Sequence, residues 1–376
     1  MDPLILTTLG FWNDPTSFTP GGFSGDIPRY SELQGHVLFQ TSGSSGNPKW
    51  IALSKQALLT SAAAVNRHLD VRPSSHWGLA LPSHHVGGFG VAARAFDAGC
   101  PLHVFGLRWD PLAFAGWLVN CGITHTSLVP TQVHDLVAAG LRAPATLSAI
   151  VVGGGHLDME TGQAARSLGW PVLASYGMTE AASQIATQGL DSLEIPYRPS
   201  PIPLLPIWQA ETSAEQLLRI TGPALFSGVV VGSSNSWVFH PREQEWYQTQ
   251  DRVLLAGQIL TPIGRADTLI KVLGELVDPE KIERELLYLS DGMLIPGTYA
   301  VIAIPDARAE HALVPVFEKG ADPDVIMATL VAHADQSPGF CRLRAPVILE
   351  KLPRSPLGKL RRAEIQARLL GNSPCE

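Results

Sequence analysis

Cysteine is scarce in this sequence. Cys100, Cys121, Cys341 and Cys375 form no C-x-x-C pair, so the sequence indicates neither a zinc site nor a disulfide framework. Basic residues are in the minority as well, because 27 Lys and Arg against 34 Asp and Glu give a formal net charge of −7. Such a chain has no bulk positive field for nucleic acid or an anionic membrane.

Long apolar runs are also missing. The most apolar longer stretch, residues 86–105, is interrupted by Arg94 and Asp97, which argues against a membrane span. Residues 1–15 place no basic segment before their short apolar run, so no secretory signal is evident. A reducing cytoplasm is therefore the expected location.

What the chain does have is the composition of an ordered globular protein. Its 376 residues are 45% hydrophobic and 16% charged, which is enough for a large core in two domains. Strand-like runs at 101–105, 124–129 and 149–152 alternate with helical patterns. This alternation predicts an α/β fold with a largely parallel sheet.

The chain is organised around a loop of small and hydroxylated residues that ends in a lysine. It lies between the apolar run 37–39, which we expect to be a strand, and a second short apolar run, 50–53. Glycines let a backbone approach a ligand, successive N–H groups hold an anion, and a lysine adds a full positive charge. The loop therefore suits a polyphosphate, and its candidate ligands are Thr41, Ser42, Gly43, Ser44, Ser45, Gly46 and Lys49.

This loop is not a Walker loop. Gly43 and Gly46 stand too close together, and Pro48 before the lysine disfavours a helix that starts inside the loop. A glycine-rich bend at 153–155 follows another strand-like run, at the position where open α/β sheets bind ligands. Taken alone, each of these glycine-rich segments is equally consistent with a surface turn.

The string SYGMTEAASQI, residues 175–185, is more specific. A strand should lead into YGMTE, residues 176–180, and we expect a helix after it. Tyr176 offers a flat face for a purine, Thr179 can donate to a phosphate oxygen, and Glu180 supplies a hard oxygen ligand for Mg²⁺. A capped helix start would explain Thr179 and Glu180 alone but not the whole string.

These strings, with LPSHHVGG (81–88), WYQTQD (246–251), GRAD (264–267) and LPRSPLGKLRR (352–362), resemble the adenylate-forming superfamily of acyl-CoA synthetases, adenylation domains and luciferases. The resemblance implies a large N-terminal domain, residues 1–264, and a small mobile α+β lid, residues 265–376. This sequence departs from the family pattern at Gln250, where the family motif has glycine. Fewer residues than is usual for the family precede the phosphate loop, so we expect part of the N-terminal subdomain to be missing or compressed.

The resemblance also implies roles for single residues. Lys49, His85, Glu180 and Lys359 would be catalytic, with Glu180 also holding Mg²⁺, Asp267 serving as the hinge and Gly274 lying beside the CoA tunnel. We expect Arg361 and Arg362 to belong to a solvated basic tail. The same solvated tail is the alternative to the catalytic role of Lys359. Besides the loop residues, ATP would contact Gly154, Gly155, Ser175, Tyr176, Gly177, Thr179, Asp251 and Arg265.

The segment around residues 175–185 is most similar to the o-succinylbenzoate–CoA ligases of menaquinone biosynthesis. That similarity implies ATP, Mg²⁺ and CoA, with a small carboxylate as substrate. His85, Ser183, Gln184 and Thr187 are candidates to surround the acyl group. Another acyl- or aryl-CoA ligase, a carrier-protein adenylating enzyme and a non-catalytic nucleotide-binding protein remain alternatives, and a homodimer is left open.

Overall fold

The structure, a computed structural model, describes residues 2–21, 31–41, 49–233, 236–273, 275–306, 308–355 and 358–371. The chain divides into two compact units. The first comprises Met1–Ser213, Leu218–Thr249 and Leu254–Thr261, and the second comprises Ala214–Leu217, Gln250–Val253 and Pro262–Glu376. No helix within the described ranges is long and apolar enough to cross a membrane.

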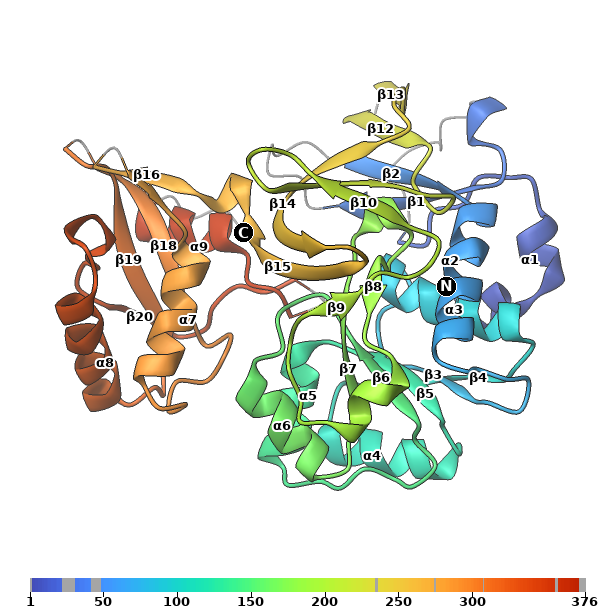
Figure 1. Ribbon diagram of the computed structural model, residues 1–376, viewed down its shortest axis with the longest axis horizontal. Helices are drawn as coiled ribbons and strands as arrows, with labels where there is room; N and C mark the ends of the chain where they lie inside the picture. The colour runs from blue at the N-terminus through green and yellow to red at the C-terminus, as the bar shows by residue number, and fades with distance from the viewer. Residues whose placement is uncertain are drawn as a thin grey trace. The chain divides into compact units, whose positions relative to one another are not determined.

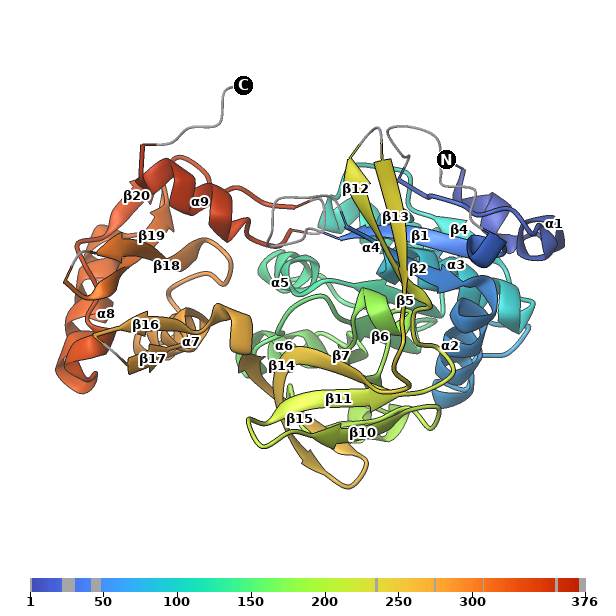
Figure 2. The same ribbon diagram turned by 90° about the horizontal axis from the view of Figure 1, so that it is seen from above.

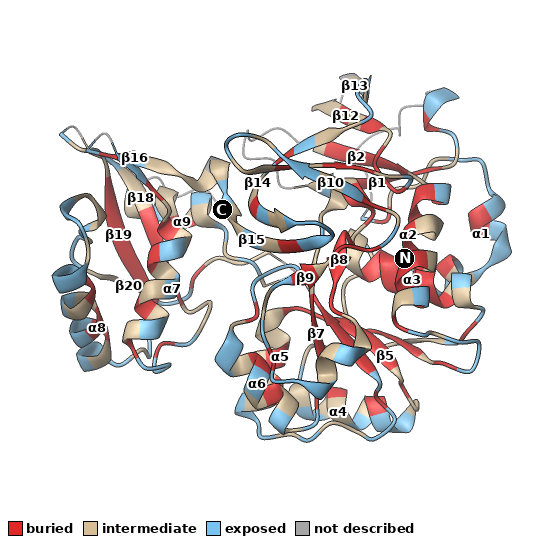
Figure 3. Cartoon of the chain, in the orientation of Figure 1, coloured by how far each residue is buried: buried red, intermediate tan, exposed pale blue. Residues whose placement is uncertain are grey.

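A six-stranded sheet forms the centre of the first unit (Figure 1). Its order is β4-β3-β5-β6-β7-β8, parallel except for the last pair, which confirms the predicted parallel α/β arrangement. The strands β5 and β6 are buried along their whole length, as Figure 3 shows for β5. The bounds are β3 Trp77–Leu79, β4 Leu102–Val104, β5 His125–Leu128, β6 Ala149–Val152, β7 Val172–Tyr176 and β8 Ala186–Thr187.

Helices cover both faces of this sheet, with α3 on one side and α5 and α6 on the other (Figures 1 and 2). Several begin where the sequence places a capping side chain: Ser54 accepts a hydrogen bond from Ala57 N, and Asp158 accepts one from Thr161 N. The bounds are α2 Lys55–His68, α3 Val86–Ala98, α4 Pro111–Asn120, α5 Pro130–Ala138 and α6 Met159–Ser167.

A second sheet has the antiparallel order β1-β2-β12-β13. Leu38, Trp50, Ala52 and Val230 form its core on one face, and the strands are β1 His36–Thr41, β2 Lys49–Ser54, β12 Gly228–Ser233 and β13 Ser236–Pro241. Its β1 edge pairs with the preceding segment at one isolated bridge, in which Phe18 N donates to His36 O at 2.9 Å and Leu38 N donates to Phe18 O at 2.8 Å. The short helix α1, Leu9–Asn13, precedes this bridge.

A third sheet has the order β10-β11-β14-β15-β9. Its strands are β9 Ile202–Pro203, β10 Gln209–Thr212, β11 Leu217–Thr221, β14 Tyr247–Ala256 and β15 Ile259–Arg265. The strands β14 and β15 carry two of the predicted nucleotide residues, Asp251 and Arg265.

The second unit is built on the sheet β18-β19-β20 and the hairpin β16-β17. Side chains alternate along β18: Tyr299 and Val301 pack in the cluster that includes Ile282 and Ile326, whereas Ala300 and Ile302 pack with Ile365. Helices α7 and α8 therefore cover one face and α9 the other (Figure 2). The bounds are β16 Ile270–Val272, β17 Glu275–Val277, α7 Pro279–Leu289, β18 Tyr299–Asp306, β19 Glu310–Glu318, α8 Pro323–Gln336, β20 Val347–Leu349 and α9 Arg362–Leu369.

The helix expected after residues 176–180 does not form. Only one 3-10 turn, Thr179–Ala181, follows β7, because Ala182 and Ser183 adopt positive φ angles of 49° and 92°. The chain then reverses, and β8 pairs antiparallel with β7. The expectation was wrong because backbone pairing with β7, rather than local helix propensity, determines this segment.

Candidate active site

The phosphate-loop segment joins two strands of the antiparallel sheet. Thr41 and Lys49 face each other at the end of the β1–β2 ladder, and both side chains are half-buried. Ser42, Gly43, Ser44, Ser45 and Gly46 lie outside the described residues. The strand predicted at 37–39 is confirmed as part of β1, and the apolar run 50–53 belongs to β2, so the lysine is held at the first position of β2.

Glu180 is tied to the same β2 strand through the start of β12. Phe226 N donates to Glu180 O at 2.8 Å, and the next residue, Ser227, donates its N–H to Ala52 O at 2.8 Å. Since β12 continues along β2 to the pair Val231 and Lys49, the turn that carries Glu180 lies against the strand that carries Lys49. Two segments about 130 residues apart in sequence thus belong to one region of the first unit.

The turn after β7 is held by its own backbone. Ile185 N donates to Tyr176 O at 2.9 Å, and Ser183 N donates to Met178 O at 3.1 Å. A Cβ on Gly177 would overlap the carbonyl oxygen of Ser183, so only glycine fits there. Tyr176 and Thr179 are half-buried, and Gly177 is exposed.

The glycine bend after β6 lies beside this turn. The strands β6 and β7 are parallel with Val152 opposite Ala174, so Gly154 and Gly155 follow β6 at the level where β7 ends in Ser175 and Tyr176. Both glycines are exposed, and Gly154 has a φ of +78°. The carboxyl edge of the parallel sheet therefore carries these four predicted nucleotide residues together.

A hydrogen-bonded network lies directly behind the turn. Gln184 is buried, and its Nε2 donates to Ser175 Oγ at 3.1 Å and to Thr187 Oγ1 at 3.0 Å. Its Oε1 accepts from Arg94 Nη2. Ser183, the neighbouring candidate, is half-buried, so Gln184 orients the surrounding groups while Ser183 is the more accessible of the two.

Arg94 is the residue that sequence reasoning missed. It is 2% exposed, its Nη1 donates to Ser127 Oγ at 3.1 Å, and its guanidinium carbon lies 5.3 Å from the centre of the Trp77 ring. Among the described residues no carboxylate forms an ion pair with it. Burial lowers the pKa of the Arg94 guanidinium to about 9, so the group still carries its charge at neutral pH. The available signal was a lone arginine within an otherwise apolar stretch.

His85 precedes the helix that carries Arg94. It is the N-cap residue of α3, half-buried, with its ring centre 4.3 Å from that of the exposed His84. A Cβ on Gly88 would collide with the carbonyl group of Pro82, so the glycine permits the sharp entry into α3. One helix thus positions both His85 and Arg94.

The second unit holds the remaining predicted residues. Arg265 Nη1 lies 2.9 Å from Asp251 Oδ1, and the Asp251 side chain is only 14% exposed. The pKa of the Lys359 ammonium is lowered by partial loss of hydration and by the nearby Arg265, while Asp251 and Glu280 oppose the shift; the residue nevertheless remains exposed to solvent. These groups share one electrostatic environment.

Three predictions at the end of the chain have different outcomes. Gly274 lies outside the described residues, and Asp267 belongs to the 3-10 turn Ala266–Thr268 that follows β15. The solvated tail expected at Arg361 and Arg362 is wrong for Arg362. Both terminal nitrogens of Arg362 bond to the carboxylate of Glu283 at 2.6 Å, and both side chains also bond to the backbone of Val301 in β18.

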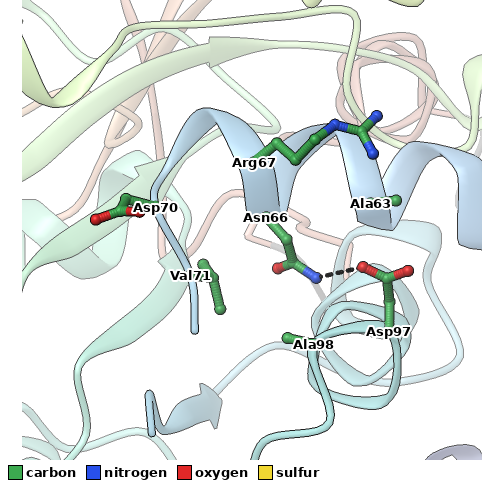
Figure 4. A pocket seen from close by; sticks show the side chains of 7 residues that line it. All are labelled: Ala63, Asn66, Arg67, Asp70, Val71, Asp97 and Ala98. Atoms are coloured by element: carbon green, nitrogen blue, oxygen red, sulfur yellow. Dashed lines mark hydrogen bonds between the residues drawn. The ribbon is translucent and has the colours of Figure 1, made fainter. Parts of the chain in front are cut away.

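A cavity of about 390 Å³ lies elsewhere in the first unit, between the ends of α2 and α3 (Figure 4). Asn66 Nδ2 donates to Asp97 Oδ2 at 2.8 Å within it. None of the predicted site residues contributes to it, since its lining is Ala63, Asn66, Arg67, Asp70, Val71, Asp97 and Ala98.

Comparison with known proteins places this arrangement in a class. The family model of AMP-binding enzymes matches residues 34–210, so this region is an AMP-binding domain and the resemblance to the adenylate-forming superfamily is confirmed. The chain is 32% identical over 282 residues to the 2-succinylbenzoate–CoA ligase of Escherichia coli K12, an alignment that covers 73% of this chain and 56% of that protein. The chain thus spans little more than half the length of this curated relative.

Two further comparisons agree. A probable 2-succinylbenzoate–CoA ligase of Mycobacterium tuberculosis H37Rv is 29% identical over 90% of this chain and 85% of its own length. The structure of o-succinylbenzoate CoA synthetase from Bacillus subtilis, in complex with ATP and a magnesium ion, superimposes with a TM-score of 0.71 at 21% identity, covering 87% of this chain and 69% of that chain. The fold is therefore that of the adenylate-forming enzymes.

Proposed function

We propose that this protein is an AMP-forming acid–thiol ligase that converts o-succinylbenzoate, ATP and CoA into o-succinylbenzoyl-CoA, AMP and pyrophosphate for menaquinone synthesis. The names of the relatives support this proposal. Within the chain, the main observation in support of this proposal is the buried guanidinium of Arg94. This group forms no ion pair with a described carboxylate.

The argument from Arg94 is electrostatic. A buried charge without an opposite charge costs free energy, so a charge retained in this position calls for an anionic ligand. o-Succinylbenzoate has two carboxylates, of which only one reacts, and the second would pair with Arg94. A Cβ on Gly90 would lie 3.3 Å from Arg94 Nη2 and 3.7 Å from Ser183 Cβ, so glycine keeps the space between these two residues free.

The first half-reaction joins the substrate to the nucleotide. A carboxylate oxygen attacks the α-phosphorus of ATP, the acyl–phosphate bond forms, and the bond to the pyrophosphate oxygen breaks. Lys49 and the loop amides would hold the β- and γ-phosphates, Tyr176 the adenine, and Asp251 and Arg265 the ribose. Lys359 would offset charge on the α-phosphoryl group, which would lower the activation barrier by about 3–4 kcal/mol.

Glu180 fits the magnesium site expected for this chemistry. The described residues contain no cluster of three or more His, Cys, Asp or Glu that could hold a metal by themselves. Magnesium usually takes one or two carboxylates and completes its coordination with water and substrate phosphates, which agrees with a single half-buried carboxylate beside the nucleotide segments. Bound there, the ion would neutralise charge on the triphosphate.

The second half-reaction uses CoA. Its sulfur attacks the acyl carbon, AMP leaves, and the thiol proton passes to solvent. Because Lys359 serves only the first step, we propose that residues 265–376 move as a lid on residues 1–264 about Asp267, which would bring Gly274 beside the CoA tunnel. His85, Ser183, Gln184 and Thr187 would surround the acyl group. We further propose a cytoplasmic enzyme, with a homodimer left open.

The test is an assay of purified protein with ATP, CoA and o-succinylbenzoate. The expected products are AMP and pyrophosphate in amounts equal to the thioester formed. Release of ADP and phosphate would overturn the proposal, and ATP binding without carboxylate-dependent pyrophosphate release would indicate a non-catalytic nucleotide-binding protein. A panel of carboxylates with either CoA or a holo-carrier protein distinguishes the proposed ligase from other acyl-activating enzymes.

A further inference from the structure

Lys359 lies in a tight turn between two short arms of chain. Ser355 N donates to Lys359 O at 2.7 Å, and Arg361 N donates to Pro353 O at 2.9 Å across the arms. We call the described residues of this segment, 352–355 and 358–362, the Lys359 hairpin. The turn is also closed by Gly358 N, which donates to Ser355 O at 2.8 Å, and by Lys359 N, which donates to Ser355 Oγ at 3.2 Å, so the position of the lysine depends on what holds the two arms.

The first arm is held by Glu318, the last residue of β19. Its Oε1 accepts from Leu352 N and from Arg354 Nη2, each at 2.9 Å. Arg354 Nη2 also donates to Gly297 O at 2.5 Å. One carboxylate oxygen thus fixes both the backbone and a side chain of this arm.

The second arm is held by Glu283 on α7. Its two carboxylate oxygens accept from Nη1 and Nη2 of Arg362, each at 2.6 Å, which is the paired geometry that makes guanidinium–carboxylate contacts directional. Glu283 Oε1 also accepts from Val301 N at 2.6 Å. The carboxylate therefore joins the hairpin, α7 and β18 at one point.

These two carboxylates differ from an ordinary surface ion pair. The side chains of Glu283 and Glu318 are 15% and 22% exposed, whereas Glu350, which pairs with Lys319 at 2.6 Å in the same unit, is 81% exposed. Exposed pairs are screened by water and contribute little, while partly buried, multiply bonded pairs restrict the chain more strongly.

We propose that Glu283 and Glu318 are positioning residues which hold the Lys359 hairpin from both arms, so that the ammonium enters the adenylation step in a fixed geometry. The inference rests on the proposed function, because it needs Lys359 to act on the α-phosphoryl group. Stabilisation of developing charge depends on groups already in place, and a misplacement of about 1 Å costs on the order of a hundredfold in rate.

The experiment measures both half-reactions in Glu283→Gln, Glu318→Gln and the control Glu350→Gln. Glutamine keeps the shape and an accepting oxygen but removes the charge. We expect the adenylation kcat to fall about tenfold or more in the first two variants, with the KM for ATP nearly unchanged. Thioester formation from supplied acyl-adenylate should stay near the wild-type rate, and Glu350→Gln should behave as wild type.

A double-mutant cycle with Lys359→Ala separates positioning from general destabilisation. If the carboxylates act through Lys359, adding Glu283→Gln to Lys359→Ala should cause no further loss of adenylation. Additive losses, equal losses of both half-reactions, or variants indistinguishable from Glu350→Gln would overturn the positioning role while leaving the proposed function intact. A wild-type protein that forms no AMP and pyrophosphate would instead refute the proposed function, and the positioning role with it.

Discussion

Replacement of Arg94 by methionine tests whether the buried guanidinium serves the substrate or the fold. In the proposed complex the guanidinium would donate to the second carboxylate of o-succinylbenzoate. A hydrogen bond to a charged group contributes about 1.5–3 kcal/mol, so losing two such bonds should lower kcat/KM about a hundredfold or more. The matched substrate is 3-benzoylpropionate, which lacks the aromatic carboxylate and should lose little.

In contrast to kcat/KM, the stability of Arg94→Met should change little. Arg94 makes only two described side-chain hydrogen bonds, and removing a buried charge that has no ion-pair partner among the described residues relieves a desolvation cost that offsets their loss. The melting temperature of Arg94→Met should therefore stay within about 4 °C of wild type, equivalent to about 1 kcal/mol in a unit of this size.

Arg166→Met is the matched control. This guanidinium donates to the carbonyl oxygens of Val172, Ser192 and Ile195 and lies over the ring of Tyr197. Loss of this guanidinium should lower the melting temperature. It should leave the ratio of kcat/KM for o-succinylbenzoate and 3-benzoylpropionate unchanged. If Arg94→Met destabilises the protein as much as Arg166→Met does, or lowers kcat/KM equally for both acids, the assignment of Arg94 to the substrate is wrong.

The pH dependence of this preference has a definite sign. Burial lowers the pKa of Arg94 to about 9, so the guanidinium is charged below that pH and loses its proton as the pH rises through it. The ratio of kcat/KM for o-succinylbenzoate to that for 3-benzoylpropionate should consequently be constant near neutral pH and fall as the pH rises through about 9. Groups that serve both acids, Lys359 included, cancel in this ratio.

Three further outcomes are expected. Lys359→Ala should slow adenylation about a hundredfold or more but largely spare thioester formation from supplied acyl-adenylate, and equal loss of both steps would refute the domain-rotation scheme. Glu280→Gln removes a carboxylate that raises the pKa of Lys359. Because Lys359 acts as a cation, the loss of adenylation activity at alkaline pH should then begin at a lower pH than in the wild type. An unchanged pH profile would show that Glu280 does not affect Lys359. Gly177→Ala should destabilise the protein by about 3 kcal/mol or more through overlap with Ser183 O, whereas Gly116→Ala, in open space within α4, should stabilise it by about 0.5–1 kcal/mol; similar melting temperatures for both would show that the turn is not tight.

Local features of the sequence were sufficient for much of the fold. The apolar run before the phosphate loop predicts β1, and the alternation of strand-like runs with helical patterns between residues 101 and 152 predicts the parallel sheet. In each case the signal comes from side chains a few positions apart, whose spacing reports which face is buried. The resemblance of ordered motifs likewise pointed to the AMP-binding family that residues 34–210 match.

Only the tertiary structure decided the features that depend on residues far apart in the chain. The turn after Thr179 follows from pairing between β7 and β8, which overrides helix propensity. Arg94 is hydrogen-bonded to Ser127 and Gln184, which are 33 and 90 positions away in the sequence. Arg362 forms its ion pair with Glu283, which is 79 positions earlier. A residue's sequence neighbours do not determine its dielectric surroundings or its charge partners, because folding brings those together from distant segments.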